Sequence, residues 1–267
     1  MPSYDAPELS VSIQAYVATV EIQRPPHNFF DFALIKQIAD TYEQMDEDPA
    51  VRTILLCANG KSFCAGANFG DGSTVQADGS VEGSVNRVGV DHLYVEAVRV
   101  FSAKTPVVAA IQGAAIGGGL GLALSADFRV GCPESRFAAN FTRLGFHPGF
   151  GLTHTLPRAI GHQNAAKMFL TSRRLKGEEA FDIGLLDEMA TLETLRQAAW
   201  DLAREIAINS PLGVTSTRAT LRVGIADAVR AATDHELAQQ NWLRKTEDFK
   251  EGVAATHDRR LPNFQGV

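Results

Sequence analysis

Three consecutive glycines in the middle of the chain have the clearest potential for chemistry. They are Gly117, Gly118 and Gly119, and they follow an apolar run at residues 107–111. Because glycine has no Cβ, a ligand atom can approach a bare backbone N–H at such a turn. The apolar residues 120–124 predict a buried helix that begins there, with first N–H groups that lack intrahelical acceptors and carry partial positive charge. The stretch suits a developing oxyanion or a phosphate, and the alternative is glycines that serve packing alone.

Three other interpretations of this stretch fail on its residues. Gln112, several glycines and polar flanking sequence disfavour a membrane span. A G-x-G-x-x-G dinucleotide fingerprint requires a glycine where Leu124 stands. No Lys-Ser or Lys-Thr pair follows the glycines, which excludes a P-loop.

The elements around the glycines alternate between strand and helix patterns. Residues 107–111 have the length and the β-branched content of a strand buried on both faces. Alternation predicts a hairpin from residues 9–13 and 16–22, and helical spacing predicts a helix over residues 30–45. The further strands predicted are 51–57, 128–132, 135–138 and an extended piece at 185–189, and the further helices before residue 192 are 92–104, 152–160, 163–170 and 177–181.

From residue 192 onwards only helical patterns occur, at residues 192–208, 212–223, 226–245 and 247–255. This change divides the chain into region 1–191 and a helical region 192–267. Strands that alternate with helices, followed by helices alone, predict an α/β core with a helical C-terminal part. Arg244 and the charged residues that follow it predict a solvated or subunit-facing surface, and the alternative is a binding patch.

Composition limits the class of partner. With 267 residues, 45% apolar and 21% charged, the chain has the composition of a globular protein with a large core. Its net charge of −6 argues against a general nucleic-acid or anionic-membrane binder. The cysteines, Cys57, Cys64 and Cys132, are odd in number and lie in or beside apolar runs, which predicts reduced thiols. The first residues lack an export pattern, so we expect a cytoplasmic protein.

Two motifs resemble the signature of the crotonase superfamily, which contains enoyl-CoA hydratases and isomerases. The glycine stretch matches as residues 113–121 followed by Ala126 and Asp127, and the upstream motif is KSFCAGAN at residues 61–68. The resemblance covers nearly the whole chain. It implies an α/β fold, a crotonase-type spiral of β-β-α units with a C-terminal helical trimerisation region. It also implies an acyl-CoA substrate, no cofactor beyond coenzyme A itself, and self-association as a homotrimer or a dimer of trimers.

The resemblance assigns two backbone N–H groups, those of Ala67 and Gly118, to the thioester oxygen. An enolate formed during the reaction would be stabilised there, and loss of one such donor typically costs about 10² to 10³ in rate. Cys64 precedes the first donor by three residues. It is open to two interpretations, a nucleophile or a small buried residue before the turn.

By resemblance, coenzyme A would lie along an edge formed by Arg24, His27, Ala65 and Asn68. Relatives usually carry Asp where this chain has Asn68, so the acceptor is kept and the charge is lost. Arg24, with Arg259 or Arg260 from the tail, is a candidate for the CoA phosphates because guanidinium pairs well with phosphate. The alternative for each is a surface arginine.

The chain departs from the family pattern at both acid–base positions. Hydratases of this superfamily use two glutamates that hold a water, and this sequence has Gly121 at the first position and Phe141 at the second. Neither side chain can move a proton. Ordinary hydration and double-bond isomerisation are therefore both in question, whereas stabilisation of an enolate is not.

Residues 140–151, NFTRLGFHPGFG, resemble the crotonase-type decarboxylases of polyketide β-branching. Loss of CO₂ from a β-carboxylated thioester needs little acid–base help, which suits a site without glutamates. Those enzymes use a lysine in the flap, however, and in residues 68–91 only Arg87 is basic. Residues 119–121 also resemble aroyl-CoA dehalogenases, whose nucleophilic Asp would fall at about Gly149, so the sequence does not support that chemistry.

Histidine is the remaining side chain with an ordinary pKa near neutrality. His147 lies where relatives close a loop over the acyl group and is the first candidate for acid–base work. His92 is the second, and we expect it to contact the substrate together with Phe141 and Gly149. The alternative for His147 is a ring held by a local hydrogen bond. No H-E-x-x-H or Cys/His spacing predicts a metal site.

The sequence thus predicts an acyl-CoA-processing enzyme of the crotonase superfamily that stabilises a thioester enolate. Hydration, decarboxylation, thioester hydrolysis and other enolate reactions remain open. A second class is a non-catalytic acyl-CoA-binding protein. A titratable group at the acyl site would favour the enzyme, whereas a pocket lined only by Phe141, Phe146 and Phe150 would favour binding alone.

Overall fold

The computed structural model describes residue 4 and residues 6–68 and 92–267. The predicted flap at residues 68–91, with Arg87, lies outside the described residues except for Asn68. The strands are β1 (Leu9–Gln14), β2 (Val17–Ile22), β3 (Thr53–Ala58), β4 (Val107–Ile111), β5 (Ala114–Ile116), β6 (Phe128–Gly131), β7 (Arg136–Ala138), β8 (Arg174–Lys176) and β9 (Glu188–Met189). The helices are α1 (Phe32–Glu47), α2 (Leu93–Ser102), α3 (Gly118–Ser125), the 3₁₀ turn η1 (Thr142–Leu144), α4 (Leu152–Ile160), α5 (His162–Thr171), α6 (Gly177–Asp182), α7 (Leu195–Ala207), α8 (Pro211–Leu221), α9 (Ile225–Leu243) and α10 (Glu247–His257).

The described strands form two sheets. The larger has the order β1-β2-β3-β4-β6-β9, and the smaller has the order β5-β7-β8. The pair β1–β2 is antiparallel, as the hairpin prediction requires, and β2, β3, β4, β6 and β9 run parallel. The prediction of an α/β fold is confirmed.

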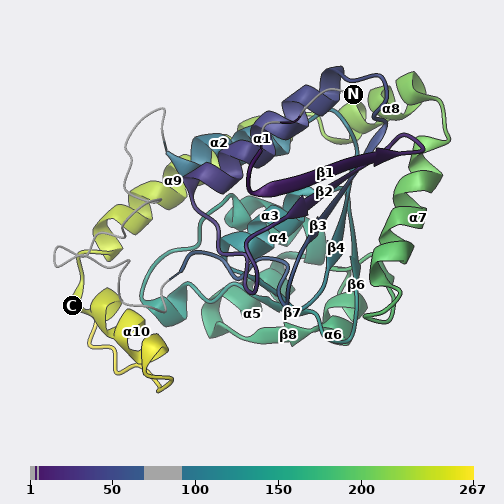
Figure 1. Ribbon diagram of the computed structural model, residues 1–267. Helices are drawn as coiled ribbons and strands as arrows, with labels where there is room; N and C mark the ends of the chain where they lie inside the picture. The colour runs from purple at the N-terminus through teal and green to yellow at the C-terminus, as the bar shows by residue number, and fades with distance from the viewer. Residues whose placement is uncertain (1–3, 5, 69–91) are drawn as a thin grey trace.

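The central strands are buried on both faces because helices cover both sides of the large sheet. In β3, Ile54 and Leu56 point into one apolar cluster, and Leu55 and Cys57 point into the other. The second cluster is closed by the alanine-rich face of α7, which runs along one side of the sheet, while α1 and α2 lie on the opposite side (Figure 1). Because helices cover both faces of the sheet, the sequences of the central strands are continuous apolar runs.

The helices of region 192–267 complete the core. Besides α7 on the sheet, α9 packs against α2 and α4, and α10 packs against η1. The division between regions 1–191 and 192–267 stays a prediction. None of the helices in the described residues combines the length and the apolar character that crossing a bilayer requires.

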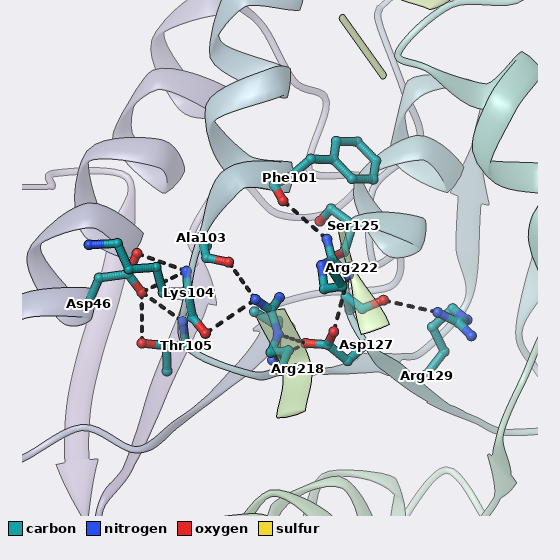
Figure 2. A network of polar contacts seen from close by, with 12 residues as sticks. Asp46, Phe101, Ala103, Lys104, Thr105, Ser125, Asp127, Arg129, Arg218 and Arg222 are labelled. Atoms are coloured by element: carbon teal, nitrogen blue, oxygen red, sulfur yellow. Dashed lines mark hydrogen bonds and ion pairs between the residues drawn. The ribbon is translucent and has the colours of Figure 1, made fainter. Parts of the chain in front are cut away.

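A buried ionic cluster ties α8 to the sheet (Figure 2). The Asp127 carboxylate, at the start of β6, accepts hydrogen bonds from Arg218 Nε at 2.8 Å and from Arg222 Nη1 at 3.1 Å. It also accepts from the backbone N–H of Val107 at 2.8 Å. Asp127 thus joins β4, β6 and α8, so this part of the signature motif is structural.

Two short strands were not predicted. β5 lies within the stretch predicted as a turn, and β8 lies between two predicted helices. Each has three residues and takes its partner from elsewhere in the chain, since β7 pairs with both.

The helix predicted from residue 30 begins instead at Phe32, because Asp31 Oδ1 accepts from the N–H of Leu34 at 2.9 Å and caps the helix. Phe30 therefore precedes the helix and faces the candidate site.

Candidate active site

A cavity of about 70 Å³ lies where the N-terminus of α3 meets α2, α9 and two loops. Most of its wall is aromatic or aliphatic, and the described residues that line it are Phe30, Ala65, Gly66, Ala67, Leu93, Tyr94, Ile116, Gly117, Gly118, Asn140, Phe141, Leu144, Phe146, Gly149, Phe150, Gln240 and Arg244. The wall thus includes both predicted oxyanion-binding residues, Ala67 and Gly118.

A bridge between the upstream motif and β5 brings these two residues together. Cys64 N–H donates to Ala114 O at 2.9 Å, and Ile116 N–H donates to Cys64 O at 3.0 Å. The chain then turns at Gly66, with φ of 86°, and a Cβ at that residue would lie 2.7 Å from Ile116 O. The same Cβ position is 4.0 Å from Gly118 N. The two motifs therefore meet at the start of α3.

The N–H groups of Ala67 and Gly118 are candidates to bind a ligand oxygen. Gly118 is the first residue of α3, so its N–H has no intrahelical acceptor. In the described part of the chain neither group has a backbone acceptor outside the regular elements. The positive end of the α3 dipole adds to them. Together they suit an oxygen that gains negative charge.

The glycines of α3 permit close packing at the cavity. A Cβ at Gly118 would lie 2.3 Å from the ring of Phe30, and a Cβ at Gly119 would lie 2.1 Å from Cys64 O. At Gly121 the Cβ would lie 2.6 Å from the Phe150 ring. The oxyanion and steric interpretations of the glycines are therefore compatible.

The positions of the two missing glutamates are filled by aromatic side chains. Phe150, 1% exposed, occupies the space beside Gly121. Phe141 lines the cavity, and its ring lies 3.6 Å from the place of a Cβ on Gly117. The Phe141 ring also makes an edge-to-face contact with the Phe146 ring, with 5.4 Å between the ring centres. This part of the described wall is therefore aromatic, with Asn140 as the neighbouring polar residue.

A polar group on the cavity wall was not predicted. Tyr94 Oη donates to Gln240 Oε1 at 3.0 Å, and Arg244 Nη2 donates to the same oxygen at 3.0 Å. Gln240 Nε2 in turn donates to the carbonyls of His147 and Pro148. The expectation of a solvated or subunit-facing surface was wrong at Arg244, because this side chain is 6% exposed and lines the cavity within a single chain. The pocket therefore contains titratable groups as well as phenylalanines.

Comparison with known proteins agrees with this geometry. The model of the enoyl-CoA hydratase/isomerase family matches residues 12–267. The chain belongs to this family. Crotonyl-CoA hydratase of Syntrophomonas wolfei is 31% identical over 250 residues, which cover 93% of this chain and 94% of that protein. 1,2-Epoxyphenylacetyl-CoA isomerase of Escherichia coli K12 is 28% identical over 256 residues, covering 95% and 97%.

A solved structure agrees as well. The enoyl-CoA hydratase/isomerase of Pseudoalteromonas atlantica T6c superposes with a TM-score of 0.85 at 28% identity, covering 97% of this chain and 100% of that one. The chain is therefore an enzyme of the enoyl-CoA hydratase/isomerase family, which acts on acyl-CoA thioesters, and the prediction of crotonase membership is confirmed.

Neither candidate histidine is among the described residues that line the cavity. His147 Nδ1 lies 2.9 Å from Pro148 O, and its ring stacks edge-on against His235 at 5.8 Å. His92 is buried and caps α2, where its Nδ1 accepts from Tyr94 N–H at 3.0 Å. Each ring thus has a local structural contact, and the acid–base role of either remains a prediction.

Of the residues predicted to hold coenzyme A, His27 and Ala65 lie side by side. Ala65 N–H donates to His27 O at 3.0 Å, and His27 is exposed. Arg24 forms ion pairs with Glu8 and Asp31, so a phosphate there would share an arginine that already has two carboxylates.

The tail arginines and Cys64 also bear on predicted roles. Arg259 is exposed with φ of 56°, whereas Arg260 pairs with Glu251. Within the described residues Arg259 forms no ion pair, so of the two it is the arginine that would lose none on binding a CoA phosphate. Burial raises the pKa of Cys64 to about 12, which favours the small buried residue over the nucleophile.

Proposed function

We propose that this enzyme binds a short acyl-CoA thioester with its carbonyl oxygen between the N–H groups of Ala67 and Gly118, where it stabilises an enolate. The observation that carries the proposal is that Ala67 and Gly118 line one cavity at the start of α3, and that within the described residues neither N–H has a backbone acceptor outside the regular elements. A cavity of about 70 Å³ has room for roughly five water-sized groups, which favours a short acyl group.

Proton transfer at this site must come from a group other than the glutamates. Tyr94 is the hydroxyl on the cavity wall, and burial, followed by the nearby Glu236, raises its pKa above the ordinary value. The phenol carries a proton, which it donates to Gln240 Oε1 in this structure, and it is our candidate acid at the site. His147 and His92 remain candidates that would need to turn towards the cavity.

A second candidate reaction is decarboxylation of a β-carboxylated thioester. Breaking the C–C bond releases CO₂ and leaves the electron pair as the enolate, so no base is needed. The replacement of both glutamates by Gly121 and Phe141 favours this reaction over hydration.

Turnover of an acyl-CoA panel, followed by mass spectrometry, tests the proposal. The panel contains crotonyl, long-chain 2-enoyl, 3-enoyl, β-carboxylated and aroyl thioesters, and the wild type is compared with Tyr94→Phe and His147→Ala. A gain of one water indicates hydration, and a loss of CO₂ indicates decarboxylation. Loss of turnover in Tyr94→Phe alone supports the phenol as the acid, and loss in His147→Ala alone supports the histidine. The proposal fails if no thioester in the panel is converted.

We also propose a homotrimer or dimer of trimers located in the cytoplasm, with no cofactor beyond coenzyme A. Large apolar side chains exposed on and around α8 support self-association, since Leu212, Leu221 and Val223 are 82%, 69% and 82% exposed in the single chain. Sedimentation equilibrium tests the assembly, and a monomer at micromolar concentration would contradict it.

A further inference from the structure

Arg244 is a buried cation with two nitrogens that lack acceptors. Its side chain follows α9 and lines the cavity that contains Ala67 and Gly118. Nη2 donates to Gln240 Oε1, whereas Nε and Nη1 have no hydrogen-bond partner within the described structure. The guanidinium carbon lies 5.6 Å from the centre of the Phe146 ring, so one face contacts an aromatic surface. The arginine is held in place but not neutralised.

No carboxylate of the described residues forms an ion pair with this guanidinium. The buried acid on the same helix is Glu236, and its oxygens are already used. They accept from the N–H of Gly151 at 2.8 Å and from the N–H and hydroxyl of Thr153 at 2.9 and 2.7 Å. Glu236 therefore caps α4 and leaves Arg244 without a counter-charge.

An unpaired buried charge is costly to a folded protein. Burial disfavours the charged form and lowers the pKa of Arg244, although an arginine remains protonated at neutral pH. Buried charges without a counter-charge are found at functional sites, where a ligand can supply the opposite charge. A carboxylate supplies acceptors that match guanidinium in geometry as well as in charge.

We propose that the acyl group of the substrate ends in a carboxylate that pairs with Arg244, so that the enzyme acts on coenzyme A monothioesters of short dicarboxylic acids. This inference rests on the proposed function, because Ala67 and Gly118 place the thioester carbonyl in the same cavity. Arg244 is then a substrate-binding residue that selects the acyl group.

The position of Arg244 favours an acyl carboxylate over a phosphate of coenzyme A. Arg244 lines the same cavity as Ala67 and Gly118, which places the guanidinium beside the acyl group of a bound thioester. Gln240 orients the guanidinium by accepting one hydrogen bond from it. The Gln240 side chain is itself held by hydrogen bonds to the His147 and Pro148 carbonyls. Nε and Nη1 of Arg244 are thus held in place on the cavity wall. In our proposal they bind the end of the acyl chain that is farthest from the thioester.

Binding of matched thioester pairs to the wild-type enzyme tests the proposal. Malonyl-, succinyl- and glutaryl-CoA are compared by calorimetry with 3-methylbutanoyl-, 4-methylpentanoyl- and 5-methylhexanoyl-CoA, in which two methyl groups replace the two carboxylate oxygens. Mass spectrometry of each sample confirms which thioester is present. We expect at least one carboxylated thioester to bind 10-fold or more tightly than its branched partner.

Variants identify the residue responsible for this preference. Arg244→Met keeps a long apolar side chain and should abolish the preference while binding of the branched thioesters is retained. Arg244→Lys keeps the charge and should restore part of the preference. Arg143→Met removes the same charge from an exposed arginine beside the cavity and should leave the wild-type ratio unchanged.

Two results overturn the inference. Equal binding within all three pairs shows that the carboxylate is not recognised, and a preference that survives in Arg244→Met shows that another residue recognises it. If the branched thioesters still bind more tightly than free coenzyme A, the proposed function stands and only the choice of acyl group fails. If no thioester binds more tightly than free coenzyme A, both fail.

Discussion

At the scale of the residue, the absence of a side chain at Gly121 is a packing requirement. The ring of Phe150 lies where a Cβ would be, at 2.6 Å. A glutamate therefore cannot be restored here without displacing an aromatic ring from the core. The chain has replaced an acid–base position by a packing contact.

Gly121→Ala should consequently destabilise the protein. We expect a loss of about 1–3 kcal/mol from overpacking, even though alanine gains about 1 kcal/mol over glycine within a helix. Urea unfolding measures the change, and Gly224→Ala, at a position with nothing within 4 Å but with φ of 76°, measures the cost of backbone strain alone.

A double-mutant cycle identifies the clash. Because the steric conflict at residue 121 is with the ring of Phe150, Phe150→Leu should offset part of the cost of Gly121→Ala. Additive effects of the two substitutions would contradict the explanation.

Sequence patterns identified part of the site at this scale. The glycines and the KSFCAGAN motif were found because their function depends on backbone conformation, which leaves a local signal. Tyr94, Gln240 and Arg244 were missed because their contact joins residues 146 positions apart. The sequence signal that could have indicated this polar group is the i,i+4 spacing of Gln240 and Arg244, which places them on one face of a helix.

At the scale of the element, Glu236 connects α9 to the N-terminus of α4. Both carboxylate oxygens accept from Gly151 or Thr153, and the side chain is fully buried. Gly151 follows Phe150 directly, so this cap also fixes the loop that forms one wall of the cavity.

Glu236→Ala should therefore destabilise the protein and loosen the cavity wall. Two backbone donors and one hydroxyl would lose their acceptor, and each unsatisfied buried group costs about 1–3 kcal/mol. We expect a loss of at least about 2 kcal/mol in urea unfolding. Asp234→Ala, on the exposed face of the same helix, should change stability by less than about 0.5 kcal/mol. Equal effects of the two variants would exclude the capping role.

Elements with strong periodicity were predicted well. Residues 107–111 and 152–160 form a strand and a helix with the predicted bounds. β5 and β8 were missed because three residues carry no period, and their pairing with β7 is tertiary.

At the scale of the whole molecule, helices from the C-terminal region hold the core and the cavity together. α7 covers the sheet, α9 carries Gln240 to the cavity, and α8 is fixed by the Asp127 cluster (Figures 1 and 2). The catalytic architecture thus depends on contacts that span the chain.

Asp127→Asn tests this dependence. It would leave Arg218 and Arg222, each largely buried, without their carboxylate, and breaking a buried pair costs about 3–5 kcal/mol. Thermal and urea unfolding should show this loss, and hydrogen exchange should increase in α8. Glu47→Gln, which breaks an exposed pair with Lys104, should cost less than about 1 kcal/mol. A cost for Asp127→Asn as small as that of the control would contradict the role of the cluster.

The central claim is that Ala67 and Gly118 hold a thioester oxygen, and binding of a matched ligand pair tests it most directly. Butyryl-CoA is compared by calorimetry with S-butyl-CoA, a thioether that has the same chain and no carbonyl oxygen. Two hydrogen bonds worth about 1 kcal/mol each predict that the thioester binds roughly 10-fold or more tightly. Equal affinities would show that these N–H groups do not bind the carbonyl oxygen, and the account of the site would be wrong.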